Sequence, residues 1–186
     1  MDINNKNAGK KAAIKCKSTK GAIDACKPCS GLYCCEKVLS DDGIIEPPYL
    51  TKHDISQIEF LTGINKEQFA DEKQNPVTQK IINVMKTTTR NGCIFFNSTT
   101  SYCQIYKFRP MDCRLFPLDI ELINDKYYWA LFKYDRCKIT KEDMYSLLKY
   151  REEALQILGD ELKNYATYPV PRMRKIGYEI LSELKN

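Results

Sequence analysis

The sequence predicts an α+β fold in which a small antiparallel sheet bears cysteine-rich loops and is flanked by C-terminal helices. Two signals indicate the sheet and the helices: β-branched and aromatic runs that meet at two-residue turns, and capped segments with apolar residues at helical spacing. The third observation concerns the loops. The chain has 186 residues and nine cysteines, which is above ordinary usage but below that of a disulfide scaffold.

The first turn signal is Asn91-Gly92, which separates residues 79–90 from residues 93–96. Residues 79–90 are rich in β-branched side chains, and Asn-Gly between two such runs is the strongest short-range indication of a hairpin. A helix that begins at Pro76 is the competing interpretation of the same stretch. Residues 102–106, beyond a polar turn, are expected to form a further short strand.

The second turn signal is Asn124-Asp125, which lies between residues 118–123 and 126–132. Both flanking runs favour strands, so we expect a second tight hairpin. The later run is also rich in aromatic side chains, which fit either alternating burial in a strand or the lining of a pocket. These side chains are Tyr127, Tyr128, Trp129 and Phe132.

Capping motifs locate two helices in the middle of the chain. Thr51-x-x-Asp54 is a capping box, the apolar residues after it recur at helical spacing, and Gly63 is a typical stop. This pattern predicts a helix over 52–62. A second helix is expected to start at Asn65, because Gln68 stands three residues later.

The chain is expected to be helical from about residue 140 onward. Thr140-x-x-Asp143 opens a helix whose apolar face packs on the core and which ends at Gly159. Pro171 fits the first turn of a last helix. The apolar stripe of that helix would consist of Met173, Ile176, Ile180, Leu181 and Leu184.

Nothing in the sequence indicates export or membrane insertion. Residues 1–23 contain no apolar run of signal-peptide type, and no stretch approaches the roughly 18 apolar residues of a spanning helix. We therefore expect a cytoplasmic protein without a membrane partner. In a reducing cytoplasm the cysteines should not form disulfides, and Cys-x-x-Cys spacing there favours metal or redox chemistry.

The formal net charge of +5 at pH 7 counts the cysteines as neutral. Eight thiolate ligands with two divalent centres would leave a net charge of roughly +1. The lysines are also scattered along the chain, as on a solvated surface. We therefore expect no nucleic-acid partner, whereas an unknown protein or peptide partner is compatible with the sequence.

The cysteines form two groups, which we interpret as the two halves of one metal-binding region. The first group lies within ten residues, where Pro28 and Gly31 favour turns that wrap an ion. It consists of Cys26, Cys29, Cys34 and Cys35. The second group has nine residues between successive members, with a further cysteine past the last predicted strand. It consists of Cys93, Cys103, Cys113 and Cys137.

Cys16 is expected to stay outside this region. It lies in residues 1–22, which are polar and basic without apolar periodicity, and ordering such a segment costs entropy. The sequence therefore predicts a flexible basic arm over 1–22. Residues 23–186 are expected to form a single cysteine-cluster metal-binding domain.

Sulfur dominates the candidate ligands. The only histidine, His53, falls in the first turn of a predicted helix and is expected on the surface. A set of thiolates favours zinc or an iron–sulfur cluster over magnesium, calcium or non-haem iron. Arg109 and Arg114 flank Cys113 and are candidates to offset the charge of the bound centre. Contact with an anionic substrate group and a surface turn are the alternatives for these arginines.

The two cysteine groups resemble a known family of cysteine-cluster proteins, whose domain is described as zinc- or iron-chelating. The family's later segment reads Cys-x-Ile-Tyr-x-x-Arg-Pro-x-x-Cys-Arg-x-Phe-Pro, and residues 103–117 match it position by position. Residues 93–96 match the preceding Cys-x-Phe-Leu, with Phe in place of Leu. Residues 26–35 match the N-terminal Cys-x-x-Cys-x-x-x-Cys-Cys with one extra residue before the pair.

This resemblance implies a zinc or iron–sulfur centre held by these cysteines. Our leading hypothesis is an iron–sulfur protein that serves electron transfer or the modification of a protein or peptide. The first alternative is a zinc-stapled interaction module without catalysis. The same domain occurs in flagellin lysine N-methylases, which use S-adenosylmethionine, so a relative of those enzymes is the second alternative. The chain is short for such an enzyme and lacks a Gly-x-Gly-x-x-Gly loop.

Overall fold

A computed structural model describes residue 35 and residues 47–88, 92–100, 102–133, 139–166 and 177–185. The predicted basic arm, residues 1–22, lies outside the described residues. Within them the chain forms four α-helices and three small antiparallel sheets, with strand orders β1-β3-β2, β4-β5 and β6-β7-β8. The predicted α+β class is therefore confirmed, although three small sheets replace the single expected one.

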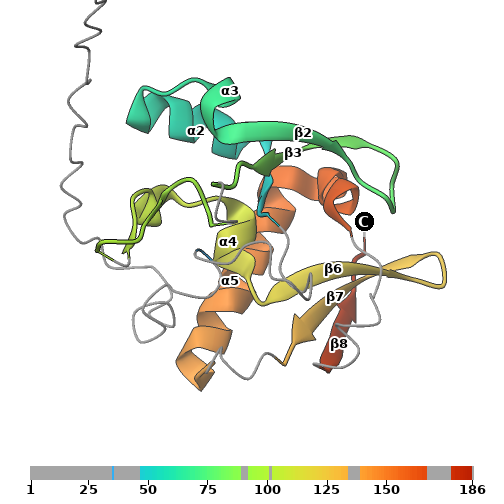
Figure 1. The fold of residues 1–186 in the computed structure, drawn as a ribbon. Helices are drawn as coiled ribbons and strands as arrows, with labels where there is room; N and C mark the ends of the chain where they lie inside the picture. Colours follow the sequence, from blue (N-terminus) through green and yellow to red (C-terminus); the bar gives the residue numbers. More distant parts are fainter. Residues whose placement is uncertain are drawn as a thin grey trace, which may run out of the picture.

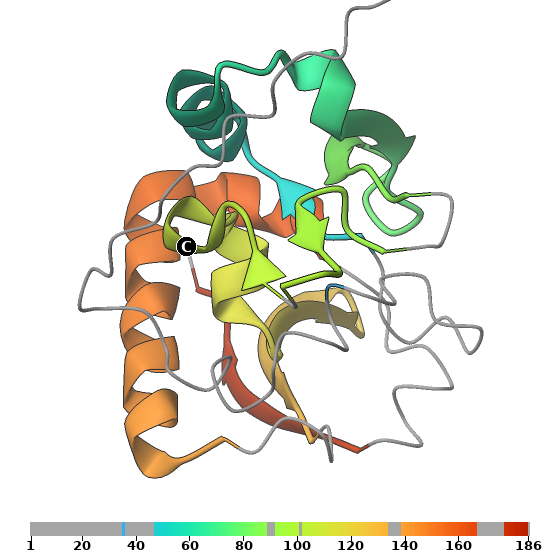
Figure 2. The ribbon, with the colours of Figure 1, turned by 60° about the vertical axis from the view of Figure 1, so that its left-hand side comes forward.

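The sheets lie at different places around two packed helices (Figure 1). Helices α2 (Lys52–Thr62) and α3 (Lys66–Phe69) lie with β2 and β3 at one end of the molecule, and β6, β7 and β8 lie at the opposite end. Helix α4 (Met111–Leu115) packs against α5 (Lys141–Leu158) between these ends, and Figure 2 shows α5 running along the side of the molecule.

The helices begin and end where the capping motifs predict. Thr51 caps α2, its hydroxyl accepting from the backbone N–H of Asp54 at 3.0 Å. Gly63 ends the helix in the left-handed conformation, with φ of 71°, which costs a glycine little. Thr140 caps α5 in the same way, and Gly159 follows its last residue.

The first sheet differs from the predicted hairpin. Strand β3 (Ile81–Met85) exists, but it pairs with β2 (Ala70–Gln74) and with β1 (Tyr49–Leu50). The expected partner, residues 93–96, contributes only an isolated bridge between Thr87 and Cys93. The sequence does not reveal β2 because four of its five side chains are polar and exposed, so it lacks the apolar alternation that indicates a strand.

The buried side chain of Asn75 joins this sheet to the C-terminal half. Its amide nitrogen donates to the carbonyls of Asn164 and Ala166, both at 3.0 Å. Its oxygen accepts from the backbone N–H groups of Val77 and Thr78, at 2.8 and 3.2 Å. Because these bonds fix the turn after β2, the competing helix from Pro76 does not form.

The predicted second hairpin is confirmed with its expected bounds. Strands β6 (Leu118–Ile123) and β7 (Lys126–Phe132) pair in register across Asn124 and Asp125. Both turn residues have positive φ, 49° and 62°, which is the conformation of a type I′ hairpin turn.

The predicted last helix is wrong over Tyr178–Glu183, which form strand β8 along the free edge of β7. The first part of that predicted helix, residues 171–176, lies outside the described residues. The spacing of Ile180, Leu181 and Leu184 is compatible with a helix and with a strand. The unpaired edge of β7 favours the strand, because it offers backbone groups for pairing.

The largest core lies between the third sheet and the helices. Its central side chain is Trp129 of β7, which is 2% exposed. Met111 and Leu115 of α4 and Leu147 and Ala154 of α5 pack around it. This core therefore holds α4 against α5 and the sheet. No helix in the described ranges is both long and apolar enough to cross a membrane.

The carboxylate of Asp54 links the starts of two helices. Oδ2 accepts from the backbone N–H and the hydroxyl of Thr51, at 2.9 and 2.7 Å, within the capping box of α2. Oδ1 accepts from the backbone N–H of Met111, the first residue of α4, at 3.0 Å. Asp143 makes the same capping bonds with Thr140 and thus offers a matched comparison.

We predict that Asp54→Ala destabilises the protein by about 3 kcal/mol, whereas Asp143→Ala costs about 1 kcal/mol. Both variants lose a capping box, but only Asp54→Ala also leaves the N–H of Met111 unpaired in the interior. Urea unfolding of the two variants, prepared under the same conditions, measures the difference. Equal losses would show that the bond to α4 contributes nothing.

Tyr165 gives a second prediction. Burial, reinforced by the neighbouring carboxylate of Glu161, raises the pKa of Tyr165 above its usual value of 10.0. The pKa of Tyr165 is thus higher in the folded protein than in the unfolded chain. The contribution of this side chain to the free energy of unfolding is therefore complete below about pH 10 and is lost as the pH rises further.

Replacing Tyr165 with Phe should therefore make the free energy of unfolding less sensitive to pH between about pH 9 and pH 11. Tyr145→Phe is the control, because that side chain is 76% exposed. Urea midpoints measured across this range test the idea, which fails if the two variants show the same pH dependence.

Candidate metal centre

Four of the eight candidate ligands, Cys35, Cys93, Cys103 and Cys113, lie in the described residues. The other four, Cys26, Cys29, Cys34 and Cys137, lie outside them, as does Cys16. The four described cysteines come from four separate segments of the chain, so their arrangement depends on tertiary structure.

A short hairpin positions Cys103. Strand β4 (Phe96–Asn97) pairs with β5 (Tyr102–Cys103), and Phe96 stands opposite Cys103. The side-chain oxygen of Asn97 accepts from the backbone N–H groups of Thr99 and Thr100, at 2.9 and 3.2 Å. This Asx turn closes the loop between the two strands. The predicted strand over 102–106 is shorter than expected and ends at Cys103. A 3₁₀ turn, Tyr106–Phe108, follows it.

Cys93 lies just before β4 and contacts Cys35 through the main chain. Its backbone N–H donates to the carbonyl oxygen of Cys35 at 2.6 Å. Cys35 and Cys103 both pack against the apolar cluster that contains Cys93. The two predicted halves of the region therefore meet here, through Cys35 on one side and the β4–β5 hairpin on the other.

Cys113 approaches from a helix rather than from a strand. It is the third residue of α4, which follows the Arg109-Pro110 step. Two carboxylates fix this short helix: Asp54 accepts from the N–H of Met111, and Oδ2 of Asp112 accepts from the N–H of Tyr49 at 3.0 Å. Helix α4 is thus tied to α2 and to β1, and both ties determine where Cys113 lies.

The charges of the other three described cysteines reach Cys113. Burial is the largest cause that raises the pKa of Cys113 well above its usual value of 9.0, and Asp112 is the second. The charges of Cys93, Cys103 and Cys35 each raise it further. Four thiolates at this place would therefore repel one another strongly unless a cation neutralised them.

Cys93 differs from Cys113 because its sulfur has hydrogen-bond donors. Burial raises the pKa of Cys93, and hydrogen bonds from the backbone of Phe95 and of Phe96 lower it. Such bonds stabilise a thiolate, and bonds to sulfur are a common means of tuning a thiolate-bound metal.

Apolar side chains pack around Cys93, and Cys35 and Cys103 lie against the same cluster. Phe69, Phe95 and Ile105 are at most 5% exposed and belong to the cluster around Cys93. The rings of Phe69 and Phe95 lie 5.8 Å apart. These side chains limit the access of water to the sulfur of Cys93, which is buried, and lower the local dielectric constant there.

The two candidate arginines stack on aromatic rings. The guanidinium of Arg109, which is 6% exposed, lies 4.4 Å from the centre of the Tyr106 ring. The guanidinium of Arg114 lies 5.5 Å from the Tyr150 ring of α5. Both contacts have cation–π geometry. Arg114 thus helps to join α4 to α5, and a role of either arginine toward a bound centre stays a prediction.

The donor set fits a zinc or iron–sulfur centre in its chemistry, since all eight candidate ligands are thiols. Among the described residues, no three histidine, cysteine, aspartate or glutamate side chains are grouped as metal ligands would be. His53 is exposed on α2, as predicted for a surface residue. The four described cysteines by themselves therefore do not form a group of metal ligands.

Sequence reasoning missed Asp54 and Asp112 as the residues that position the site. Asp54 was interpreted only as part of the capping box of α2. The bond that it forms with Met111 spans 57 positions, and that of Asp112 with Tyr49 spans 63. The only available signal was the proximity of Asp112 to Cys113.

The chain matches a protein-family model. Residues 25–131 match the model of the CxxCxxCC family, which is described as a putative zinc- or iron-chelating domain. The chain belongs to this family. The matched range includes the four described cysteines, and the resemblance predicted from the cysteine motifs is confirmed. No solved structure matches the chain.

We predict that Cys113→Ser lowers the metal bound per chain by about tenfold at limiting metal, because it removes a ligand from the centre of the group. Cys16→Ser is the matched control, since Cys16 lies before the family match, and should leave the metal content unchanged. Elemental analysis after gel filtration provides the measurement. Equal metal in both variants would exclude Cys113 as a ligand.

Proposed function

We propose that the chain binds an iron–sulfur centre and serves electron transfer or the modification of a protein or peptide in the cytoplasm. The observation that supports the proposal is that the charges of Cys35, Cys93 and Cys103 all raise the pKa of Cys113. Cys35 and Cys103 also pack against the apolar cluster that contains Cys93. Membership of a zinc- or iron-chelating family supports a metal at this place.

The surroundings of the sulfurs favour a redox-active centre. An iron–sulfur cluster is commonly held by four thiolates, and hydrogen bonds, burial and nearby charge set its reduction potential. Burial and backbone hydrogen bonds to sulfur are both present at Cys93. The apolar side chains around it would exclude water and thereby protect such a centre.

The number of cysteines also exceeds what one closed zinc site needs. The family match contains Cys26, Cys29 and Cys34 besides the four described cysteines. With Cys137 the candidate set has eight thiols, enough for two centres with four thiolates each. When bound, an iron–sulfur centre supplies one-electron chemistry, and the protein supplies its binding, its orientation and its electrostatic environment.

Zinc is the competing occupant. Cys113 lies on α4, which the bonds of Asp54 and Asp112 hold in place, as expected of a closed structural site. In that case the metal would contribute to folding alone, and the chain would be an interaction module.

The deciding experiment is anaerobic purification from a minimal medium that supplies both iron and zinc. The iron–sulfur proposal predicts iron with an equal amount of acid-labile sulfide, and visible absorption that bleaches on reduction with dithionite. Cys113→Ser should lose this absorption and Cys16→Ser should keep it. A colourless protein with stoichiometric zinc and no sulfide would overturn the proposal and establish the zinc-bound module instead.

A further inference from the structure

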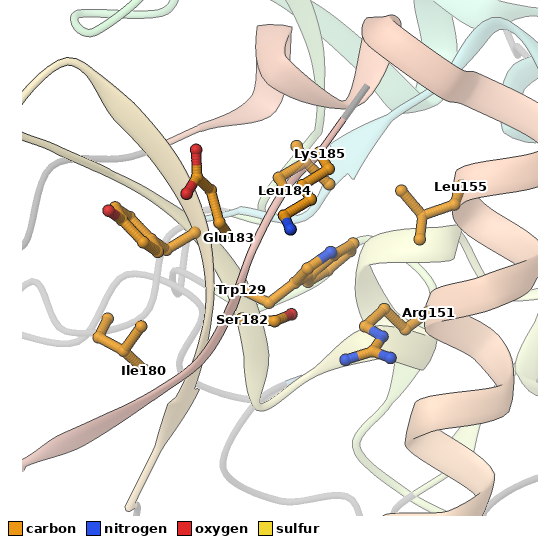
Figure 3. A pocket seen from close by; sticks show the side chains of 9 residues that line it. Trp129, Arg151, Leu155, Ile180, Ser182, Glu183, Leu184 and Lys185 are labelled. Carbon is orange, nitrogen blue, oxygen red and sulfur yellow. The ribbon is translucent and has the colours of Figure 1, made fainter.

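A hollow separate from the cysteine group lies between α5 and strands β7 and β8 (Figure 3). Its volume is about 690 Å³, which is within the usual range for small-molecule sites. Its lining comes from three elements and the segment that follows β8: Tyr128, Trp129, Arg151, Leu155, Ile180, Ser182, Glu183, Leu184 and Lys185.

One wall of the hollow is apolar. In Figure 3 the side chains of Arg151 and Leu155 extend from α5 toward the indole of Trp129. Leu184 also lines the hollow and is 7% exposed. Trp129, Leu155 and Leu184 thus offer an aromatic and aliphatic surface to the body of a small molecule.

A bulge in the sheet shapes this wall. Trp129 pairs with Ser182, but its neighbour Ala130 pairs with Ile180, so Leu181 is an extra residue in β8. Bulges bend a strand and redirect its side chains, and they are frequent beside functional sites. The indole Nε1 of Trp129 is buried and has no hydrogen-bond partner, which is uncommon for a buried donor.

Among the described residues that line the hollow, one cation has no carboxylate partner. The guanidinium of Arg151 binds Glu152, with Nη2 to Oε1 at 2.7 Å. The carboxylate of Glu183 lies 3.7 Å from the ammonium of Lys126. Within the described ranges no carboxylate lies within 4 Å of Lys185, whose charge is therefore available to a ligand.

We propose that this hollow binds a small organic monoanion, a carboxylate with an apolar body. Lys185 receives the carboxylate, with Arg151 as a second donor, and the body contacts Trp129, Leu155 and Leu184. A single uncompensated cation beside Glu183 favours one negative charge over a multiply charged phosphate. The proposal is independent of the metal centre, because none of the four cysteines in the described ranges lines this hollow.

Trp129 is the only tryptophan of the chain, so its fluorescence reports on the site directly. We expect octanoate to produce a saturable change in the emission of the full-length protein, and its affinity to fall as salt is added. The uncharged analogue octanamide should bind about tenfold more weakly or worse, because it lacks the charge that Lys185 recognises.

Lys185→Gln should weaken octanoate binding by about tenfold. Lys133→Gln is the matched control: Lys133 follows β7, pairs with Glu179 at 3.6 Å and lies outside the hollow. Calorimetry provides a second readout if the emission is insensitive. The proposal is overturned if octanoate produces neither saturable emission nor heat, if octanamide binds equally well, or if the two lysine variants bind octanoate with the same affinity.

Discussion

The buried carboxylate of Asp54 is the constraint on which the arrangement of the sulfur atoms depends. It completes the cap of α2 and at the same time accepts the first N–H of α4. A helix of five residues has little stability of its own, so α4 requires such external partners. Asp112 supplies the second one through β1. The position of Cys113 is thus set by two carboxylates that bind backbone groups rather than by the sulfur chemistry itself.

The cysteine group illustrates how distant segments form one chemical environment. Strand β5 holds Cys103, helix α4 holds Cys113, and a main-chain hydrogen bond joins Cys93 to Cys35. The charges of Cys35, Cys93 and Cys103 together raise the pKa of Cys113. The interior around them is apolar, so the cost of carrying several negative charges there is large without a cation.

Sequence reasoning succeeded where the signal is local. The capping boxes at Thr51 and Thr140 and the turn at Asn124-Asp125 determine backbone geometry within a few residues, and α2, α5 and the β6–β7 hairpin follow from them. Strands β2 and β8 were missed because a neighbouring strand edge, rather than their own side-chain pattern, selects their conformation. The cysteine spacing likewise indicated the group, whereas the long-range bonds of Asp54 and Asp112 leave no pattern in the sequence.

The contact between Cys35 and Cys93 has a consequence for how the site survives chemical change. The bond joins the N–H of Cys93 to the carbonyl of Cys35, so neither sulfur takes part in it. Oxidation of a thiol or departure of a metal therefore leaves this link chemically intact. Cys35 therefore stays bound to Cys93 through main-chain atoms, and its thiol would remain near the site when a metal ion binds again.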